Sequence, residues 1–109
     1  MWGGPPRISR GLEMKLISIS PSTRKDKKLT AIFELENGRT LRTHFGQRGA
    51  SDYTIHKDKE RRELYRNRHE KDLNTGDPTR AGYLSWYLLW GDSTSLQKNI
   101  KQFKRKFDL

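Results

Sequence analysis

Apolar and β-branched residues form three short runs in the first half of the chain. Residues 14–20 form the first run, and Pro21 follows them, which predicts a strand that ends there. The next two runs, residues 29–35 and 39–45, flank the pair Asn37-Gly38. Asn-Gly suits the positive φ angles of a type I′ turn, so we predict a β-hairpin with a two-residue turn.

A two-residue turn determines which residues face each other across this hairpin. Glu36 is expected to face Arg39, and Phe33 is expected to face Arg42 in a cation–π contact. In this register, Arg42 and His44 share one face of the sheet with Phe33.

The pattern becomes helical after the predicted sheet. Asp58 is expected to cap a charged helix over residues 59–73, whose apolar stripe is narrow. The arginines expected to stay available on its surface are Arg61, Arg62, Arg66 and Arg68. Mutual pairing of charges one turn apart, such as Asp58 with Arg62, is the alternative and would leave only a solvated face.

Two more helices are predicted toward the end of the chain. Asp77 and Pro78 are typical of a helix start, residues 83–90 are apolar nearly all round, and Gly91 is expected to cap the end. Thr94 begins a capping box with Gln97, and an amphipathic helix follows it. The apolar stripe of that helix consists of Leu96, Ile100, Phe103 and Phe107.

These elements predict an α+β fold. We expect a small antiparallel sheet of about three strands, one charged helix, and a C-terminal helical hairpin that covers one sheet face. Residues 1–13 are rich in proline and glycine and are expected to form an extended N-terminal arm. Residues 14–109 are expected to form a single α+β domain.

The charge balance points to a polyanionic partner. The 109 residues include 23 Lys and Arg against 13 Asp and Glu, which gives a formal net charge of +10. Such an excess attracts phosphate-rich molecules, so the phosphate backbone of DNA or RNA is the favoured partner. An acidic or capsid protein is the alternative partner.

Composition also bounds the location of the protein. There is no cysteine, which excludes disulfides and thiolate zinc sites. No apolar run approaches the ~20 residues that span a bilayer, and the first residues lack the apolar core of a signal peptide. We therefore expect an intracellular, soluble protein without a membrane span.

No motif in the chain predicts catalysis. His44, His56 and His69 lie 12 and 13 residues apart, which is not the spacing of a local metal site. The carboxylates also lack a recognisable two-metal spacing, although a nuclease would have to use residues such as Asp52 or Glu63. We therefore expect no enzyme activity, no metal and no cofactor.

Basic residues gather in several clusters that are candidates for phosphate contacts. Residues 45–49 add two glycines, whose exposed backbone amides could bind phosphate beside Arg48, although the glycines could equally just turn the chain. The basic residues of the last helix also oppose its dipole favourably, which is a competing structural role. The predicted nucleic-acid-binding residues are Arg24, Lys25, Lys27, Lys28, Arg39, Arg42, His44, Arg48, Arg62, Arg66, Lys98, Lys101, Lys104 and Arg105.

Four short segments of the sequence stand out together, namely Thr43-His44-Phe45-Gly46, Ser51-Asp52-Tyr53-Thr54, Arg68-His69 and Tyr87-Leu88-Leu89-Trp90. In these segments the chain resembles a family of small basic proteins encoded by nucleocytoplasmic large DNA viruses, the giant viruses. The resemblance implies a viral context, with a virion component as one role, and the family has no assigned activity. A much weaker similarity is to the WGR DNA-binding domain, but this chain has Phe45-Gly46-Gln47 where that domain has Trp-Gly-Arg.

The residues therefore predict a non-enzymatic, sequence-tolerant nucleic-acid-binding protein, and the resemblance extends this prediction to a virion component associated with a viral genome. The alternative is a small structural or minor capsid protein that binds other proteins in a larger assembly. No side-chain pattern indicates reading of bases in a groove.

Overall fold

The computed structural model describes residues 14–109, so the predicted N-terminal arm lies outside the described residues. Three strands come first and pair antiparallel in the order β2-β3-β4. Their bounds are Lys15–Pro21 for β2, Lys27–Glu34 for β3 and Thr40–Gln47 for β4. The helices that follow are α1 (Tyr53–His56), α2 (Lys59–His69), the 3₁₀ helix η2 (Glu70–Thr75), α3 (Ala81–Leu84), the π-helix η3 (Ser85–Leu89) and α4 (Leu96–Phe107). The predicted α+β fold with a three-stranded antiparallel sheet is confirmed.

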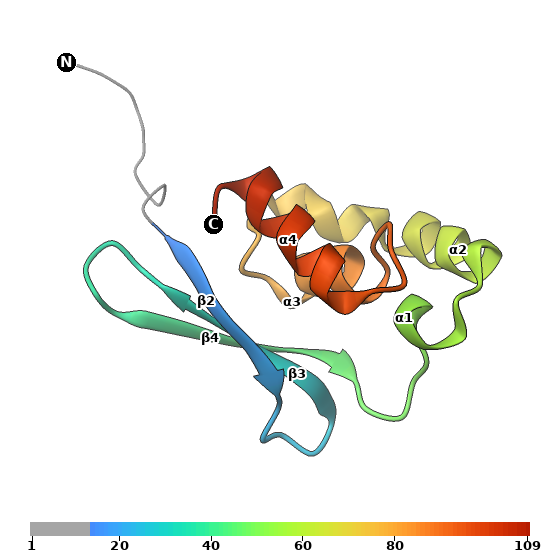
Figure 1. The fold of residues 1–109 in the computed structure, drawn as a ribbon, viewed down its shortest axis with the longest axis horizontal. Coiled ribbons are helices and arrows are strands. Elements are labelled where there is room, and N and C mark those ends of the chain that lie inside the picture. Colours follow the sequence, from blue (N-terminus) through green and yellow to red (C-terminus); the bar gives the residue numbers. More distant parts are fainter. Residues whose placement is uncertain (1–13) are drawn as a thin grey trace.

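The helices lie together on one side of the sheet (Figure 1). Phe33 and Phe45 point from the strands into the core, where they meet Leu84, Leu88 and Phe103. These five side chains are at most 1% exposed, so the sheet is held to α3, η3 and α4 mainly by apolar burial. Among residues 14–109, Figure 1 shows no helix on the other side of the sheet, and we call that side the open face.

The β3–β4 hairpin has a three-residue loop instead of the predicted two-residue turn. The backbone N–H of Leu35 donates to the carbonyl of Arg39 at 2.7 Å, and the N–H of Gly38 donates to the carbonyl of Leu35 at 2.9 Å. Gly38 has a φ of +85°, and Asn37 keeps a negative φ. This is a turn followed by a glycine in the left-handed region, the next most common way to close a hairpin.

The longer loop shifts the register by one residue, so the predicted pairing was wrong. Phe33 faces Leu41, and Arg42 faces Ile32. A shift of one residue moves a side chain to the opposite face of the sheet. Arg42 and His44 therefore lie on the open face, away from the fully buried Phe33, and the predicted Phe33–Arg42 cation–π contact does not form.

The charged helix begins where the sequence predicts but ends earlier. The Asp58 carboxylate accepts hydrogen bonds from the N–H groups of Glu60 and Arg61, which confirms it as the cap of α2. After His69 the chain tightens into η2, which ends at Gly76 with a φ of +68°. The regular helix is therefore shorter than the predicted residues 59–73.

Asp77 caps a turn and not a helix, contrary to the prediction. Its carboxylate accepts from the backbone N–H of Thr79 at 3.0 Å and from the Thr79 hydroxyl. The Asp77 carbonyl accepts from the N–H of Arg80 at 3.2 Å. Because the aspartate satisfies backbone groups within this local turn, the helix starts only at Ala81.

The predicted cap of the apolar helix is displaced by one residue. The helix ends in η3, where the N–H of Trp90 donates to the carbonyl of Ser85 at 3.0 Å. Gly91 follows this end, and its role is to leave space. A Cβ at this position would lie 2.2 Å from the Tyr87 carbonyl oxygen and 2.8 Å from Asn99 Cγ. The glycine is thus required for close approach between the helices.

Helix α4 docks as predicted but starts at a different cap. Ser95, not Thr94, accepts from the backbone N–H of Lys98. The side-chain amide of the buried Asn99 accepts a hydrogen bond from the backbone N–H of Ser93 and donates one to the backbone carbonyl of Ser93. These two bonds fix the turn before α4 and place Ser95 at the helix start. The stripe that holds α4 to the core is the predicted one, namely Leu96, Ile100, Phe103 and Phe107.

Candidate functional site

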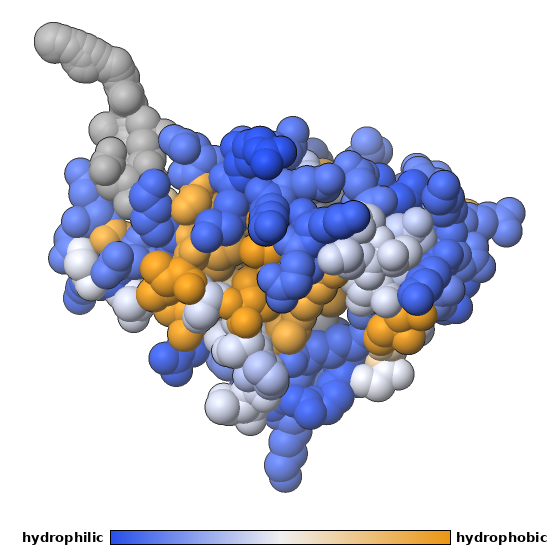
Figure 2. Space-filling view, in the orientation of Figure 1, coloured by the Kyte–Doolittle hydropathy of each residue, from blue (hydrophilic) through white to orange (hydrophobic). Residues whose placement is uncertain are grey.

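The outer side of α4 forms a basic surface. Lys98, Lys101 and Arg105 recur at steps of three and four, opposite the buried stripe, and all three are exposed. Helix α4 contains no acidic residue. Within residues 14–109 none of these three side chains forms an ion pair. Figure 2 shows this strongly hydrophilic band over α4. We refer to these three residues as the α4 basic face.

Lys104 and Lys106 flank the α4 basic face. Lys104 borders a small groove against β2, together with Ile17 and Ile100. The Lys106 ammonium lies 5.8 Å from the centre of the Phe107 ring. With Arg105, these lysines occupy the last turn of the helix, so part of their effect is favourable interaction with the helix dipole.

The β2–β3 loop contains a second cluster, part of which is structural. Arg24 and Lys25 are exposed at its tip, and Lys27 begins β3 half-buried. Arg48 reaches back to this loop from the end of β4 and donates to three carbonyl oxygens, those of Ser22, Arg24 and Lys27, at 2.9 to 3.2 Å. Its guanidinium therefore braces the loop.

Arg39 and Arg42 are exposed on the hairpin and on the open face of the sheet, respectively. His44 lies on the same face as Arg42, and its Nδ1 is 2.8 Å from both the Ser22 and the Thr30 hydroxyl. One side of the imidazole is thus held by these two hydroxyl groups, and Arg42 is the more accessible basic residue on this face.

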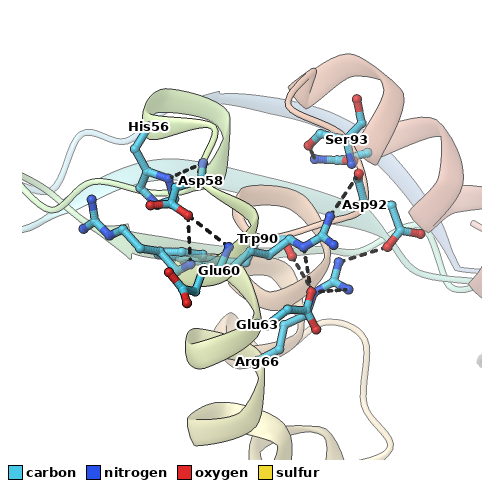
Figure 3. Close-up of polar contacts among 11 residues, drawn as sticks. His56, Asp58, Glu60, Glu63, Arg66, Trp90, Asp92 and Ser93 are labelled. Carbon is cyan, nitrogen blue, oxygen red and sulfur yellow. Dashed lines mark hydrogen bonds and ion pairs between the residues drawn. The ribbon is translucent and has the colours of Figure 1, made fainter.

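Arg66 holds α2 against the turn after η3 (Figure 3), and Arg62 contacts the same turn. Arg66 donates through Nε to the Trp90 carbonyl at 2.9 Å and through Nη2 to Asp92 at 3.0 Å. Arg62 donates to the Asp92 carbonyl at 3.2 Å and pairs with Glu63 at 2.9 Å. The Arg62 guanidinium also lies 4.8 Å from the centre of the Tyr53 ring, and the Arg66 guanidinium lies 4.8 Å from the centre of the Trp86 ring. The two side chains are only 15% and 16% exposed, so their role is structural.

The neighbouring arginines, Arg61 and Arg68, line a cavity of about 410 Å³. It lies between α2, the β3 and β4 strands and η3, and its other walls include Lys28, Gly46 and Ser85. Arg61 and Arg68 are seven residues apart, which places them two turns apart on one side of α2. We call this site the basic cavity.

One wall of the basic cavity contains a buried ion pair. Lys28 Nζ lies 2.6 Å from Asp52 Oδ2, and the two side chains are 18% and 2% exposed. Asp52 also caps α1 by accepting from the N–H and hydroxyl of Thr54. The carboxylate expected for a nuclease is therefore occupied by a cap and an ion pair.

Stacked rings form another wall. Tyr65 lies between His69 and Trp90, with ring centres 4.2 Å apart on both sides. Burial raises the pKa of the Tyr65 phenol above its ordinary value, and the nearby Asp72 carboxylate raises it further. A hydrogen bond to Ser85 and the positive charge of Arg68 lower this pKa by a smaller amount. Both faces of the Tyr65 ring are covered, so this ring is a wall and not a free stacking surface.

Gly46, in the predicted phosphate-binding loop, has a packing role. It has a φ of +79°, and a Cβ would lie 2.8 Å from Leu89 Cδ1 and 3.3 Å from Lys28 Cβ. Gly49, by contrast, has open space around it. The strand continues through Gly46 to Gln47, so Gly46 does not turn the chain out of the sheet.

The predicted site residues thus belong to separate surfaces. Lys28 lines the basic cavity, while the α4, loop and sheet clusters come from different elements. Sequence reasoning expected all four arginines of this helix to be available, but it chose only Arg62 and Arg66 as nucleic-acid-binding residues and left out Arg61 and Arg68. The spacing of Arg61, Tyr65 and Arg68 along one side of a helix was the signal that could have identified the cavity wall.

Two further findings concern the described residues as a whole. Across residues 14–109 no group of three His, Asp or Glu side chains is placed to hold a metal ion. None of the helices in that range is long and apolar enough to cross a membrane.

Comparison with known proteins gives one match. A model of a family of unknown function (DUF5754) matches residues 17–69, just under half of the chain. No curated protein matches the chain, and no solved structure does. The matched segment contains the sheet from Ile17, α1 and α2, and so most of the basic cavity. The chain is therefore similar, over this segment, to a family of unknown function.

Proposed function

We propose that this protein is a non-enzymatic, sequence-tolerant nucleic-acid-binding protein that contacts the phosphate backbone. The observation that carries the proposal is the α4 basic face. Three exposed cations lie in one row on a helix without acidic residues, and within residues 14–109 none of them is neutralised by an ion pair. Such a row suits the regularly spaced charges of a nucleic-acid strand.

The exposed cations Arg24, Lys25, Arg39 and Arg42 support the same function. Together with the net charge of +10, they give a field that attracts a polyanion from several directions. Contacts to phosphates fix the position of a protein but carry no sequence information, so we propose binding without base preference. The resemblance to small basic proteins of giant viruses extends this proposal to a genome-associated virion component.

Fluorescence anisotropy with a labelled duplex and a labelled single strand tests the proposal. Affinity is expected to fall as salt rises from about 50 to 200 mM, because phosphate contacts release condensed counterions. Duplexes of unrelated sequence are expected to bind equally well. The proposal would be refuted if no binding were detected at the lowest salt concentration, or if the affinity did not change with salt concentration.

A second candidate function, a structural protein in a larger assembly, has support of its own at the outer edge of β2, which pairs only with β3 among residues 14–109. Ile17 lies where the pairing of β2 with β3 is irregular, and it is 52% exposed. It borders a groove together with Ile100. Figure 2 shows apolar surface beneath α4. Unpaired strand edges beside apolar surface favour contacts with other chains. Light scattering separates the candidates, since assembly predicts self-association that Ile17→Lys abolishes.

A further inference from the structure

The basic cavity contains positive charge that the fold does not use. Within the described residues, the guanidinium groups of Arg61 and Arg68 make no ion pair and no side-chain hydrogen bond. Arg62 and Arg66, on the adjacent side of α2, make several. The helix thus separates arginines that hold the fold from arginines that face a hollow.

The remaining charges of the cavity leave it positive. Lys28 is neutralised by Asp52 at 2.6 Å, and His69 lies 3.0 Å from the Asp72 carboxylate. Arg61 and Arg68 therefore supply the uncompensated charge. Two cations held beside one hollow repel each other, and an anion between them removes that repulsion.

The shape and chemistry of the walls favour a phosphate group over a base. A volume of about 410 Å³ is within the range of ligand pockets. Both faces of the Tyr65 ring are covered by His69 and Trp90, so a base finds no open face on this ring. Guanidinium groups bind phosphate oxygens through two parallel hydrogen bonds, and the guanidinium-bearing side chains of Arg61 and Arg68 both line the cavity.

We propose that the basic cavity binds a phosphomonoester dianion, with Arg61 and Arg68 as its principal ligands. A phosphomonoester carries close to two negative charges and three acceptor oxygens, which matches two guanidinium groups. This site is distinct from the α4 basic face and does not depend on the proposed function. The phosphate can belong to a small nucleotide or to the end of a nucleic-acid strand.

Nuclear magnetic resonance titration of the full chain tests this proposal. The probes are inorganic phosphate, adenosine monophosphate, adenosine, and an oligonucleotide with or without a 5′-phosphate. Phosphate and the monophosphate are expected to shift the amide signals of the cavity residues with half-saturation below about 1 mM, and adenosine is expected to leave them unchanged. Tighter binding of the monophosphate than of the phosphorylated strand assigns a small nucleotide, and the reverse order assigns a strand end.

Two double variants make the test specific. Arg61→Gln with Arg68→Gln is expected to weaken binding of the monophosphate by at least about tenfold, since two charged ligands are lost. Lys59→Gln with Lys71→Gln removes the same charge from exposed lysines that do not line the cavity and is expected to bind normally. All four side chains are exposed, so both variants should fold, as circular dichroism and melting will verify.

The proposal fails if no probe shifts the cavity signals, if adenosine binds as well as the monophosphate, or if both double variants weaken binding equally. The proposal is also overturned if the 5′-phosphate does not raise the affinity for the oligonucleotide and the small phosphates do not shift the amide signals of the cavity residues. That result would leave the proposed nucleic-acid binding at α4 unaffected. Conversely, cavity binding of the monophosphate without any binding of nucleic acid supports this site and removes the proposed function.

Discussion

Replacing Arg66 with alanine is expected to destabilise the fold while leaving nucleic-acid binding nearly unchanged. Sequence reasoning placed this arginine among the phosphate-binding residues. In the structure its side chain is 16% exposed and holds α2 to the turn after η3. The variant therefore separates a structural role from a binding role.

The size of the effect follows from three contacts. The bond from Nε to the Trp90 carbonyl is part-buried, and a charged hydrogen bond contributes about 1.5–3 kcal/mol. The guanidinium lies 4.8 Å from the Trp86 ring centre, which adds about 0.5–1 kcal/mol. The Asp92 side chain is 72% exposed, so solvent limits that ion pair to less than about 1 kcal/mol. Arg66→Ala should lower the free energy of unfolding by about 2–4 kcal/mol.

Urea unfolding followed by tryptophan fluorescence measures this loss, since Trp86 and Trp90 both touch Arg66. Arg66→Lys keeps the charge but not the planar fork, so it should recover only part of the stability. Asp92→Asn should cost less than about 1 kcal/mol. An Arg66→Ala variant within about 0.5 kcal/mol of the wild type, or one with full stability but weak nucleic-acid binding, would refute the structural assignment.

Two other predictions concern stability near the basic cavity. Burial raises the pKa of the Tyr65 phenol in the folded state, so the unfolded chain loses this proton first and the free energy of unfolding should fall as pH rises above about 10. Tyr65→Phe should make this fall less steep when the melting temperature is measured against pH. An equally steep fall in the variant and the wild type would contradict the prediction. Gly46→Ala and Gly38→Ala both introduce a side chain at positive φ, but only the first meets a neighbour, Leu89 Cδ1 at 2.8 Å. Gly46→Ala should therefore cost about 1–3 kcal/mol more in chemical unfolding, and equal losses for both variants would count against the packing role.

The sequence was a good guide wherever a repeating pattern faced a core. The stripe from Leu96 to Phe107 sits against the sheet as its spacing predicted, because burial of a whole apolar face outweighs local alternatives. The three strands were also predicted close to their observed bounds. Periodicity records which side of an element is buried, so it predicts elements well.

Local turn chemistry was predicted less well because several geometries suit the same residues. Asn37-Gly38 fits both a two-residue and a three-residue hairpin loop, and the choice moved Arg42 to the other face of the sheet. Asp77 followed by proline suits both a helix start and a turn. These choices depend on contacts with distant parts of the chain, which a local pattern does not record.

The candidate site shows the same limit. Arg61, Arg62, Arg66 and Arg68 are alike as residue types, and their roles differ only by which neighbour each side of α2 meets. Helical spacing separates the pairs, but only the fold shows that one side meets the Trp90 turn and the other a cavity. The basic character was predictable from composition, whereas its division into structural and available charge was not.

The salt dependence of DNA binding by an α4 variant tests the central claim most directly. The variant replaces the α4 basic face, Lys98, Lys101 and Arg105, with glutamine. Its control replaces the exposed Lys57, Lys59 and Lys71 with glutamine and thus removes equal charge. If all three α4 residues contact phosphates, the slope of log affinity against log salt should shrink by about 2.7 in the variant and stay unchanged in the control. Equal slopes for the variant, the control and the wild type would contradict the claim that α4 binds the phosphate backbone.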